Sequence, residues 1–110
     1  MTEHWVINAS PLILLGKAGQ LEWLLRLGQV IVPQSVANEV AAGSADDAAR
    51  LWLSSPVGAP LIRRDVPARD DLLAWDLGQG ETAVIACALA NPDYEAVLDD
   101  AAARRCLNRR

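Results

Sequence analysis

The chain has 110 residues, of which 52% are hydrophobic and 22% are charged. These values fit a single globular core and exclude a disordered chain or two separate domains. The net charge of −4 argues against a surface that binds nucleic acid by positive charge alone, but it is compatible with a site that binds phosphate through a metal ion. With no bilayer-length apolar run and no basic leader, we expect one domain over residues 1–110, free of membranes, in the cytoplasm.

Short apolar strands alternate with helices along the whole chain. Strands are expected at residues 4–7 (HWVI), 29–32 (QVIV), 61–62 (LI) and 96–98 (AVL). Helices are expected from Ser10 onward, over residues 21–27, about 35–42, 46–53, weakly over 70–75, over 81–89, and from 101 onward. This alternation predicts an α/β fold with a parallel sheet and helices on both of its faces.

Local signals mark several helix ends. Ser10 followed by Pro11 predicts an N-cap hydroxyl with proline at the first helical position. Gly28 predicts a C′ glycine after the helix at 21–27, and the acidic pair at 46–47 is expected in the first turn of its helix. The segment LGQG, residues 77–80, predicts a tight turn before the most apolar helix.

Polar side chains follow the predicted strands or lie on the helices after them. They are Asn8, Glu39, Glu81, Asp99 and Asp100. Mg²⁺ and Mn²⁺ prefer oxygen ligands, and two or three carboxylates from separate elements can hold such an ion, activate water and offset phosphate charge. Because function in parallel sheets lies at the carboxyl ends of strands, these residues predict an acidic site that cuts phosphodiesters.

Each of these residues also has a purely structural interpretation. The helix dipole alone favours Glu81 in a first helical turn, and Glu39 fits an ordinary exposed helix position. The aspartates at 99 and 100 fit the cap of a final helix, and Asn8 fits a turn. The functional interpretation therefore depends on all of them meeting at one edge of the sheet.

The tryptophans and cysteines point to packing rather than chemistry. Trp5, Trp23, Trp52 and Trp75 are expected to be core or interface anchors rather than platforms for stacked bases. Two cysteines do not form a disulfide framework, and Cys87, inside an apolar run, is expected to be buried.

Four blocks of sequence resemble the PIN-domain family, in the family's order and over most of the chain. The blocks are VINASPLILLGKAGQL, VIVPQSVANEV, LGQGETAVIACAL and AVLDDAAARR. More narrowly, they are similar to a small prokaryotic branch that opens with an aspartate-hydroxyl-Ser-Pro-Leu-Ile motif. The resemblance implies a three-layer α/β/α sandwich with a central parallel sheet. It also implies a Mg²⁺- or Mn²⁺-dependent ribonuclease, which in prokaryotes is often the toxin of a toxin–antitoxin pair.

The resemblance also implies a role for each candidate residue. Asn8 stands at the first acidic position and Glu39 at the acid on the helix after the second strand. Glu81 stands at the acid after the glycine turn, and Asp100 at the acid after the last core strand, with Asp99 beside it. The implied catalytic residues are Glu39, Glu81 and Asp100. The implied metal ligands are Asn8, Glu81, Asp99 and Asp100.

Two more positions match the family, and two features depart from it. Ser10 matches the hydroxyl that accompanies the first acid, and Arg104 matches the basic residue of the next helix. Asn8 replaces the usual aspartate, so it keeps a carbonyl oxygen but loses a negative charge, which weakens metal binding. The chain also stops at Arg110, where relatives continue, which predicts a truncated C-terminus and a core completed by dimerisation or strand exchange.

Two hypotheses follow from these observations. In the first, the protein is a PIN-like endoribonuclease toxin with RNA as substrate and an antitoxin protein as partner. Glu81 and Asp100 then hold the Mg²⁺ or Mn²⁺ ion with its water, and Glu39 orients that water. In the second, the protein is a catalytically weakened PIN-fold module that forms a homodimer or binds another protein. A receiver-like domain is a weaker third reading, because the order of elements and the lack of a suitable lysine count against it.

Overall fold

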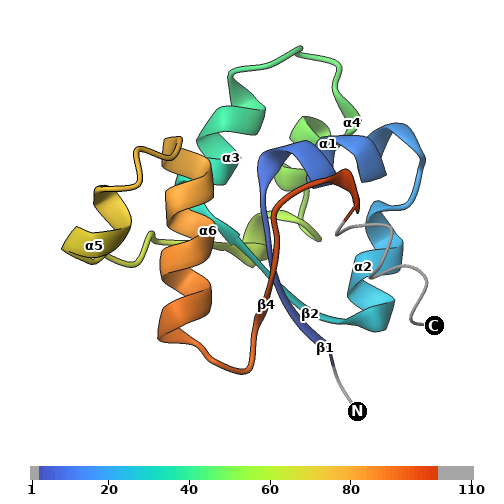
Figure 1. Ribbon diagram of the computed structural model, residues 1–110. Coiled ribbons are helices and arrows are strands. Elements are labelled where there is room, and N and C mark those ends of the chain that lie inside the picture. The colour runs from blue at the N-terminus through green and yellow to red at the C-terminus, as the bar shows by residue number, and fades with distance from the viewer. Residues whose placement is uncertain (1–2, 102–110) are drawn as a thin grey trace.

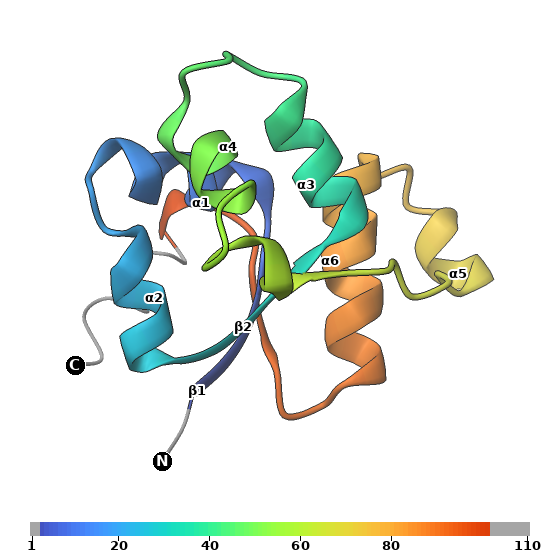
Figure 2. The same ribbon diagram turned by 180° about the vertical axis from the view of Figure 1, so that it is seen from behind.

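The structure, a computed structural model, describes residues 3–101 and consists of a parallel sheet with helices on both sides (Figures 1 and 2). Its strands are β1 (Glu3–Ile7), β2 (Gly28–Pro33), β3 (Ile62–Arg63) and β4 (Glu95–Val97). Its helices are α1 (Ala9–Lys17), α2 (Leu21–Leu27), α3 (Gln34–Ala41), α4 (Ala48–Leu53), α5 (Asp70–Leu73) and α6 (Gln79–Ala90), with a 3₁₀ turn, η1, at Ala59–Leu61.

The sheet has the strand order β3-β2-β1-β4, and every neighbouring pair is parallel. Trp5 of β1 stands opposite Val30 of β2 on one side and Glu95 of β4 on the other. The chain builds outward from β1 through β2 to β3 and then returns to the far side of β1 for β4. The order therefore reverses between β1 and β4, and in such sheets a ligand crevice forms at the carboxyl ends of the strands at this point.

The helices complete a three-layer α/β/α arrangement, as predicted. Figures 1 and 2 show α3, α5 and α6 on one side of the sheet and α1, α2 and α4 on the other. Helix α3 packs against α6, α1 packs against α4, and α6 also contacts β1, β2 and β4. The carboxyl ends of β1 and β2 lead directly into α1 and α3, so both helices begin at the same edge of the sheet.

The core lies between the sheet and these helices. The side chains of Trp5, Val6 and Ile7 in β1 are all buried, which explains why the first strand is a continuous apolar run. Val84 and Cys87 bring α6 onto this core, and the predicted burial of Cys87 is confirmed. Burying an aliphatic side chain of this size contributes about 1.5–3 kcal/mol. Within residues 3–101, no helix has both the length and the apolar character needed to cross a bilayer.

The tryptophans divide between the core and the surface. Trp5 belongs to the core, whereas Trp23 and Trp52 are half-buried. Trp75, which follows α5, has 70% of its surface exposed, so it is not part of the core. Its role as an interface anchor stays a prediction.

The first helix begins earlier than the sequence suggested, and Ser10 is not its N-cap. Asn8 occupies the N-cap position, and its extended backbone leads straight from β1 into α1. The reason is tertiary: the backbone N–H of Asn8 donates to the carbonyl of Val97 at 2.9 Å, which fixes the turn at the end of β1. Pro11 remains in the first helical turn, where its missing N–H would have had no intrahelical partner.

Other boundaries differ by one or two residues. Asp47 is the N-cap of α4 rather than part of its first turn, because its side chain accepts a hydrogen bond from the backbone N–H of Arg50 at 3.1 Å. Gly28 ends α2 as predicted, but its backbone is extended because it is also the first residue of β2. Leu61 belongs to η1, so β3 is Ile62–Arg63. The glycine-rich turn is shorter than expected, since α6 already begins at Gln79.

Candidate functional site

Asn8 joins the carboxyl ends of β1 and β4 at the point where the strand order reverses. Its side-chain Nδ2 donates to the carbonyl of Leu98 at 3.3 Å, beside the backbone bond to Val97. Its Oδ1 atom is buried and has no hydrogen-bond partner among residues 3–101. A buried acceptor without a partner is costly, so this oxygen requires a donor, a water molecule or a cation to satisfy it.

Gly80 shows what this oxygen faces. A Cβ atom placed on Gly80 would lie 3.2 Å from Asn8 Oδ1 and 3.0 Å from Glu39 Oε1. Two acceptor oxygens, one from the end of β1 and one from α3, therefore point to the same small space beside the first turn of α6. Glycine leaves that space free, and two facing acceptors are suited to a shared cation or donor.

Glu81 follows Gly80 in the first turn of α6 and is half-buried. Because the backbone N–H groups of a first turn have no intrahelical acceptors, they and the helix dipole favour a carboxylate there. The twelve-residue helix α6 thus carries Gly80 and Glu81 together to the carboxyl edge of the sheet. The role of Glu81 in the site stays a prediction.

Ser10 and Asp100 form a second pair at the same edge. The Ser10 hydroxyl donates to Asp100 Oδ1 at 3.1 Å, although the two residues are 90 positions apart in the sequence. This contact links the first turn of α1 to the segment after β4, across the point where the strand order reverses. Ser10 therefore positions a carboxylate rather than capping its own helix. Asp99, the neighbour of Asp100, is exposed.

The predicted residues thus come together as two pairs. Asn8 meets Glu39 at Gly80, and Ser10 meets Asp100. Among residues 3–101, no group of three or more His, Cys, Asp or Glu side chains is arranged to hold a metal ion. At the end of β1 the chain offers the neutral amide oxygen of Asn8 and not a carboxylate. Arg104, the predicted basic residue, lies outside the described residues.

Sequence reasoning missed two features of this edge. The first is Gly80, which was taken only as part of a turn although its missing side chain gives two oxygens room to converge. The second is Asp65, whose Oδ1 accepts from the backbone N–H of Ser35 at 3.0 Å and whose Oδ2 accepts from the Ser35 hydroxyl. Asp65 follows β3 closely, so the rule that selects polar residues after strands could have found it.

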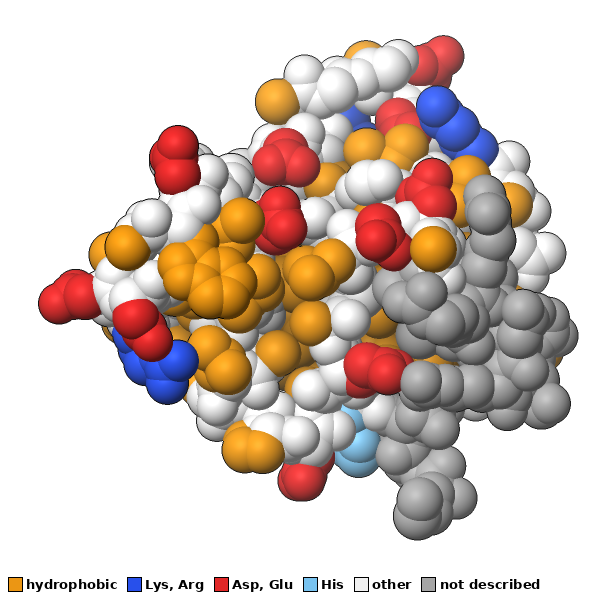
Figure 3. Space-filling view, viewed as in Figure 1, with side chains coloured by type: hydrophobic (Ala, Val, Ile, Leu, Met, Phe, Trp, Pro, Cys, Tyr) orange, Lys and Arg blue, Asp and Glu red, His pale blue; other side chains and the backbone are white. Residues whose placement is uncertain are grey.

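The surface around the site is acidic. In Figure 3, carboxylates are spread over the upper part of the face and basic side chains lie only near its margins. Two pKa shifts lie elsewhere in the structure: the Ser44 hydroxyl lowers the pKa of Asp46, and burial raises the pKa of the Cys87 thiol. Phosphate groups would be repelled from such a face unless a cation intervened.

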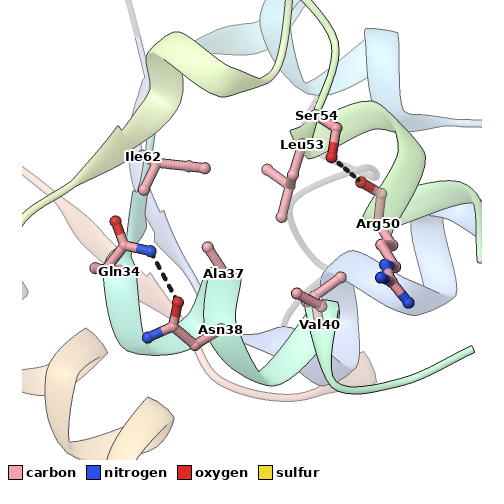
Figure 4. Close-up of a pocket in the computed structure, with 9 residues that line it drawn as sticks. Gln34, Ala37, Asn38, Val40, Arg50, Leu53, Ser54 and Ile62 are labelled. Atoms are coloured by element: carbon pink, nitrogen blue, oxygen red, sulfur yellow. Dashed lines mark hydrogen bonds between the residues drawn. The ribbon is translucent and has the colours of Figure 1, made fainter. Parts of the chain in front are cut away.

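A separate hollow lies on the other side of α3. It has a volume of about 240 Å³ between α3, α4 and β3, and Figure 4 shows Ala37, Leu53 and Ile62 around it. On its rim Gln34 donates to Asn38 at 2.9 Å. None of the predicted site residues lines this hollow, so its shape has no bearing on the chemistry of the carboxylates.

The atoms at the sheet edge suit a hard cation. Asn8 offers a buried amide oxygen that no described residue satisfies, and Glu39 offers a carboxylate oxygen facing the same space. Glu81 lies next to the glycine that keeps the space open. All of these donors are oxygens, which Mg²⁺ and Mn²⁺ prefer to nitrogen or sulfur. The residues present therefore fit a divalent cation, with fewer negative charges than a site made of carboxylates alone.

Comparison with known proteins agrees with this chemistry. The family model described as a PIN domain matches residues 4–110, which is nearly the whole chain. No curated protein and no solved structure matches the chain. PIN domains are in general nuclease-type proteins that use divalent metal ions. On this match, the chain belongs to the PIN-domain family.

Proposed function

We propose that this protein is a Mg²⁺- or Mn²⁺-dependent endoribonuclease and the toxin of a toxin–antitoxin pair. The observation that carries the proposal is the convergence of Asn8 Oδ1 and Glu39 Oε1 on the space beside Gly80, at the carboxyl edge of a PIN-type sheet. An unpartnered buried oxygen facing a carboxylate oxygen is an arrangement that a bound cation would stabilise.

In this proposal, the ligands that the family resemblance implies, Asn8, Glu81, Asp99 and Asp100, would hold the cation. When bound, the ion supplies positive charge against the scissile phosphate and makes water a stronger nucleophile. Glu39, exposed on α3 with Oε1 toward this space, accepts the proton of the attacking water. The Ser10 hydroxyl donates to Asp100, and this bond would hold the carboxylate in one orientation.

Charge supports the choice of substrate and partner. The chain carries a net charge of −4, so RNA binding depends on the cation more than on surface lysines and arginines. An acidic protein of this kind suits a basic protein partner, which is the role we assign to an antitoxin.

The test is cleavage of a labelled single-stranded RNA by the purified protein with MgCl₂, with MnCl₂ and with EDTA. We expect cleavage with either metal, none with EDTA, and a loss of about 100-fold or more for Glu81→Gln and for Asp100→Asn. Asp93→Asn is the matched control, because Asp93 is an exposed carboxylate before β4, at the opposite edge of the sheet. A wild type that cuts nothing, or variants that cut as fast as the wild type, would refute the enzyme.

A second candidate function is a weakened PIN-fold module that acts as a homodimer. It is supported by large apolar side chains on the surface: Leu73 at the end of α5, Trp75 just after it and Leu89 on α6 are between 50% and 70% exposed. Figure 3 displays hydrophobic side chains gathered over these helices. Sedimentation equilibrium of the wild type and of Trp75→Ser would decide: a dimer weakened by Trp75→Ser supports this candidate, and a monomeric wild type excludes it.

A further inference from the structure

We propose that Asp65 is a positioning residue, which caps α3 from outside the helix and so holds Glu39 toward Asn8 and Gly80. The value of this placement for catalysis rests on the proposed function. The contact itself stands on geometry that involves none of the predicted metal ligands.

Helix α3 begins without a cap of its own. Its N-cap position is Pro33, which has no side-chain hydrogen-bonding group, and Gln34 and Ser35 follow as the first helical residues. The backbone N–H groups of a first turn find no acceptor within their helix, so they need a partner from elsewhere. A helix of eight residues has few internal bonds with which to resist fraying at this end.

Asp65 supplies the missing acceptor from 30 residues away. Its Oδ1 accepts from the backbone N–H of Ser35 at 3.0 Å, and its Oδ2 accepts from the hydroxyl of the same residue. Both residues are half-buried, and Asp65 lies two positions beyond the last residue of β3. The two-point contact fixes both the position of the first turn and the rotation of α3 about its axis.

The rotation of α3 determines where Glu39 points. Ser35 and Glu39 are four residues apart, so they lie on one face of the helix, one turn above the other. Ala37 lies on the opposite side of α3, where it lines the hollow in Figure 4. Asp65 fixes the side of α3 that carries Ser35. It therefore also keeps Glu39, one turn further along the same side, against the end of α6 that carries Gly80.

Asp47 provides a matched comparison within the same chain. It is also a half-buried aspartate that accepts a backbone N–H, from Arg50 at 3.1 Å, at the start of a short helix. Helix α4, however, carries none of the candidate site residues. Asp47→Ala should therefore reproduce the loss of a cap without the loss of a positioned glutamate.

The experiment measures the backbone amide resonance of Gly80 by ¹H–¹⁵N NMR, with Glu39→Gln as the reference for a changed carboxylate beside it. We expect Asp65→Ala to move this resonance in the same direction as Glu39→Gln and to weaken binding of Mn²⁺, added as MnCl₂ alone, by about tenfold. Asp65→Asn, which keeps an oxygen for the Ser35 N–H, should restore most of both. Asp47→Ala should lower the melting temperature but leave both readouts as in the wild type.

The proposal is overturned if Asp65→Ala leaves the Gly80 resonance in place, or if Asp47→Ala moves it as far. If Asp65→Ala does not fold, Ser35→Ala decides instead, because it removes only the hydroxyl contact and should shift the Gly80 resonance less but in the same direction. A Ser35→Ala protein with an unshifted Gly80 resonance would overturn the proposal. A wild type that binds no Mn²⁺ and cuts no RNA would refute the proposed function, whereas the NMR comparison would still decide the role of Asp65.

Discussion

Replacing Asn8 by aspartate exchanges one amide for a carboxylate in the site. The contacts of Asn8 indicate how much this exchange should change the free energy of unfolding. The variant loses the hydrogen bond from Nδ2 to the carbonyl of Leu98 and places a carboxylate oxygen against that carbonyl. The other oxygen faces Glu39 across the space beside Gly80. Losing the bond and leaving a buried acceptor unpaired should lower the free energy of unfolding by about 2 kcal/mol without metal.

Adding a divalent cation should reverse this loss. The new carboxylate and Glu39 repel each other in the free protein but attract a shared cation, so metal affinity should rise above that of the wild type. At a concentration 100 times the dissociation constant, binding to the folded state adds about 2.7 kcal/mol. The assay is urea unfolding followed by tryptophan fluorescence, in EDTA and in MnCl₂.

Asn91→Asp is the control, because Asn91 also donates its side-chain amide to a backbone carbonyl, that of Cys87 at 2.8 Å. It lies at the end of α6, away from the first turn that carries Gly80. This variant should lose stability and recover none of it with Mn²⁺. If Asn8→Asp is as stable as the wild type in EDTA, or gains no more from Mn²⁺ than Asn91→Asp does, the reasoning about this site is wrong.

Three further predictions concern the site and the core. Gly80→Ala places a methyl group 3.0 Å from Glu39 Oε1, so the affinity for Mn²⁺, measured by calorimetry, should fall about 10- to 100-fold. The free energy of unfolding should change by about 1 kcal/mol or less. An unchanged affinity would contradict the idea that Asn8 and Glu39 face one shared space. Ser10→Ala frees Asp100, so RNA cleavage should slow while stability falls by about 1 kcal/mol or less; cleavage at the wild-type rate would exclude the positioning role. Burial raises the pKa of the Cys87 thiol above its ordinary value of 9.0. The buried neutral thiol therefore contributes its full stability below pH 9.0, and this contribution is lost as the pH rises through the raised pKa of the folded state. Between about pH 7 and 10.5, the midpoint of urea unfolding should decline less for Cys87→Ala than for the wild type. Equal declines for the two proteins would refute this prediction.

Much of the fold could be predicted from hydrophobic patterning. The helix over residues 21–27 matches α2 in both bounds, and continuous apolar runs located β1 and β2 to within a residue or two. Helix starts were less predictable, because they depend on contacts between distant segments. Ser10 resembles an N-cap in isolation, but the bonds from Asn8 to Val97 and Leu98 set the start of α1.

The sequence predicted where in the fold the candidate site lies, but not how its side chains are arranged. The rule that places function after parallel strands selected Asn8 and Asp100, and the structure ties both to contacts that link β1 or α1 with the segment around β4. It could not reveal that Gly80 makes room for two oxygens, since that depends on how α3 and α6 pack. The contact between Asp65 and Ser35 spans 30 residues, so no local pattern indicates it.

The proposed function requires one divalent cation at the edge of the sheet, held by Asn8 and Glu81 in the space beside Gly80 that Glu39 also faces. Anomalous diffraction from a crystal of the wild type grown with MnCl₂ tests it most directly. We expect a manganese peak in the space beside Gly80, in contact with Asn8 Oδ1 and a carboxylate oxygen of Glu81. A crystal with no manganese there, in which a water molecule or a side-chain donor satisfies Asn8 Oδ1, would contradict the account.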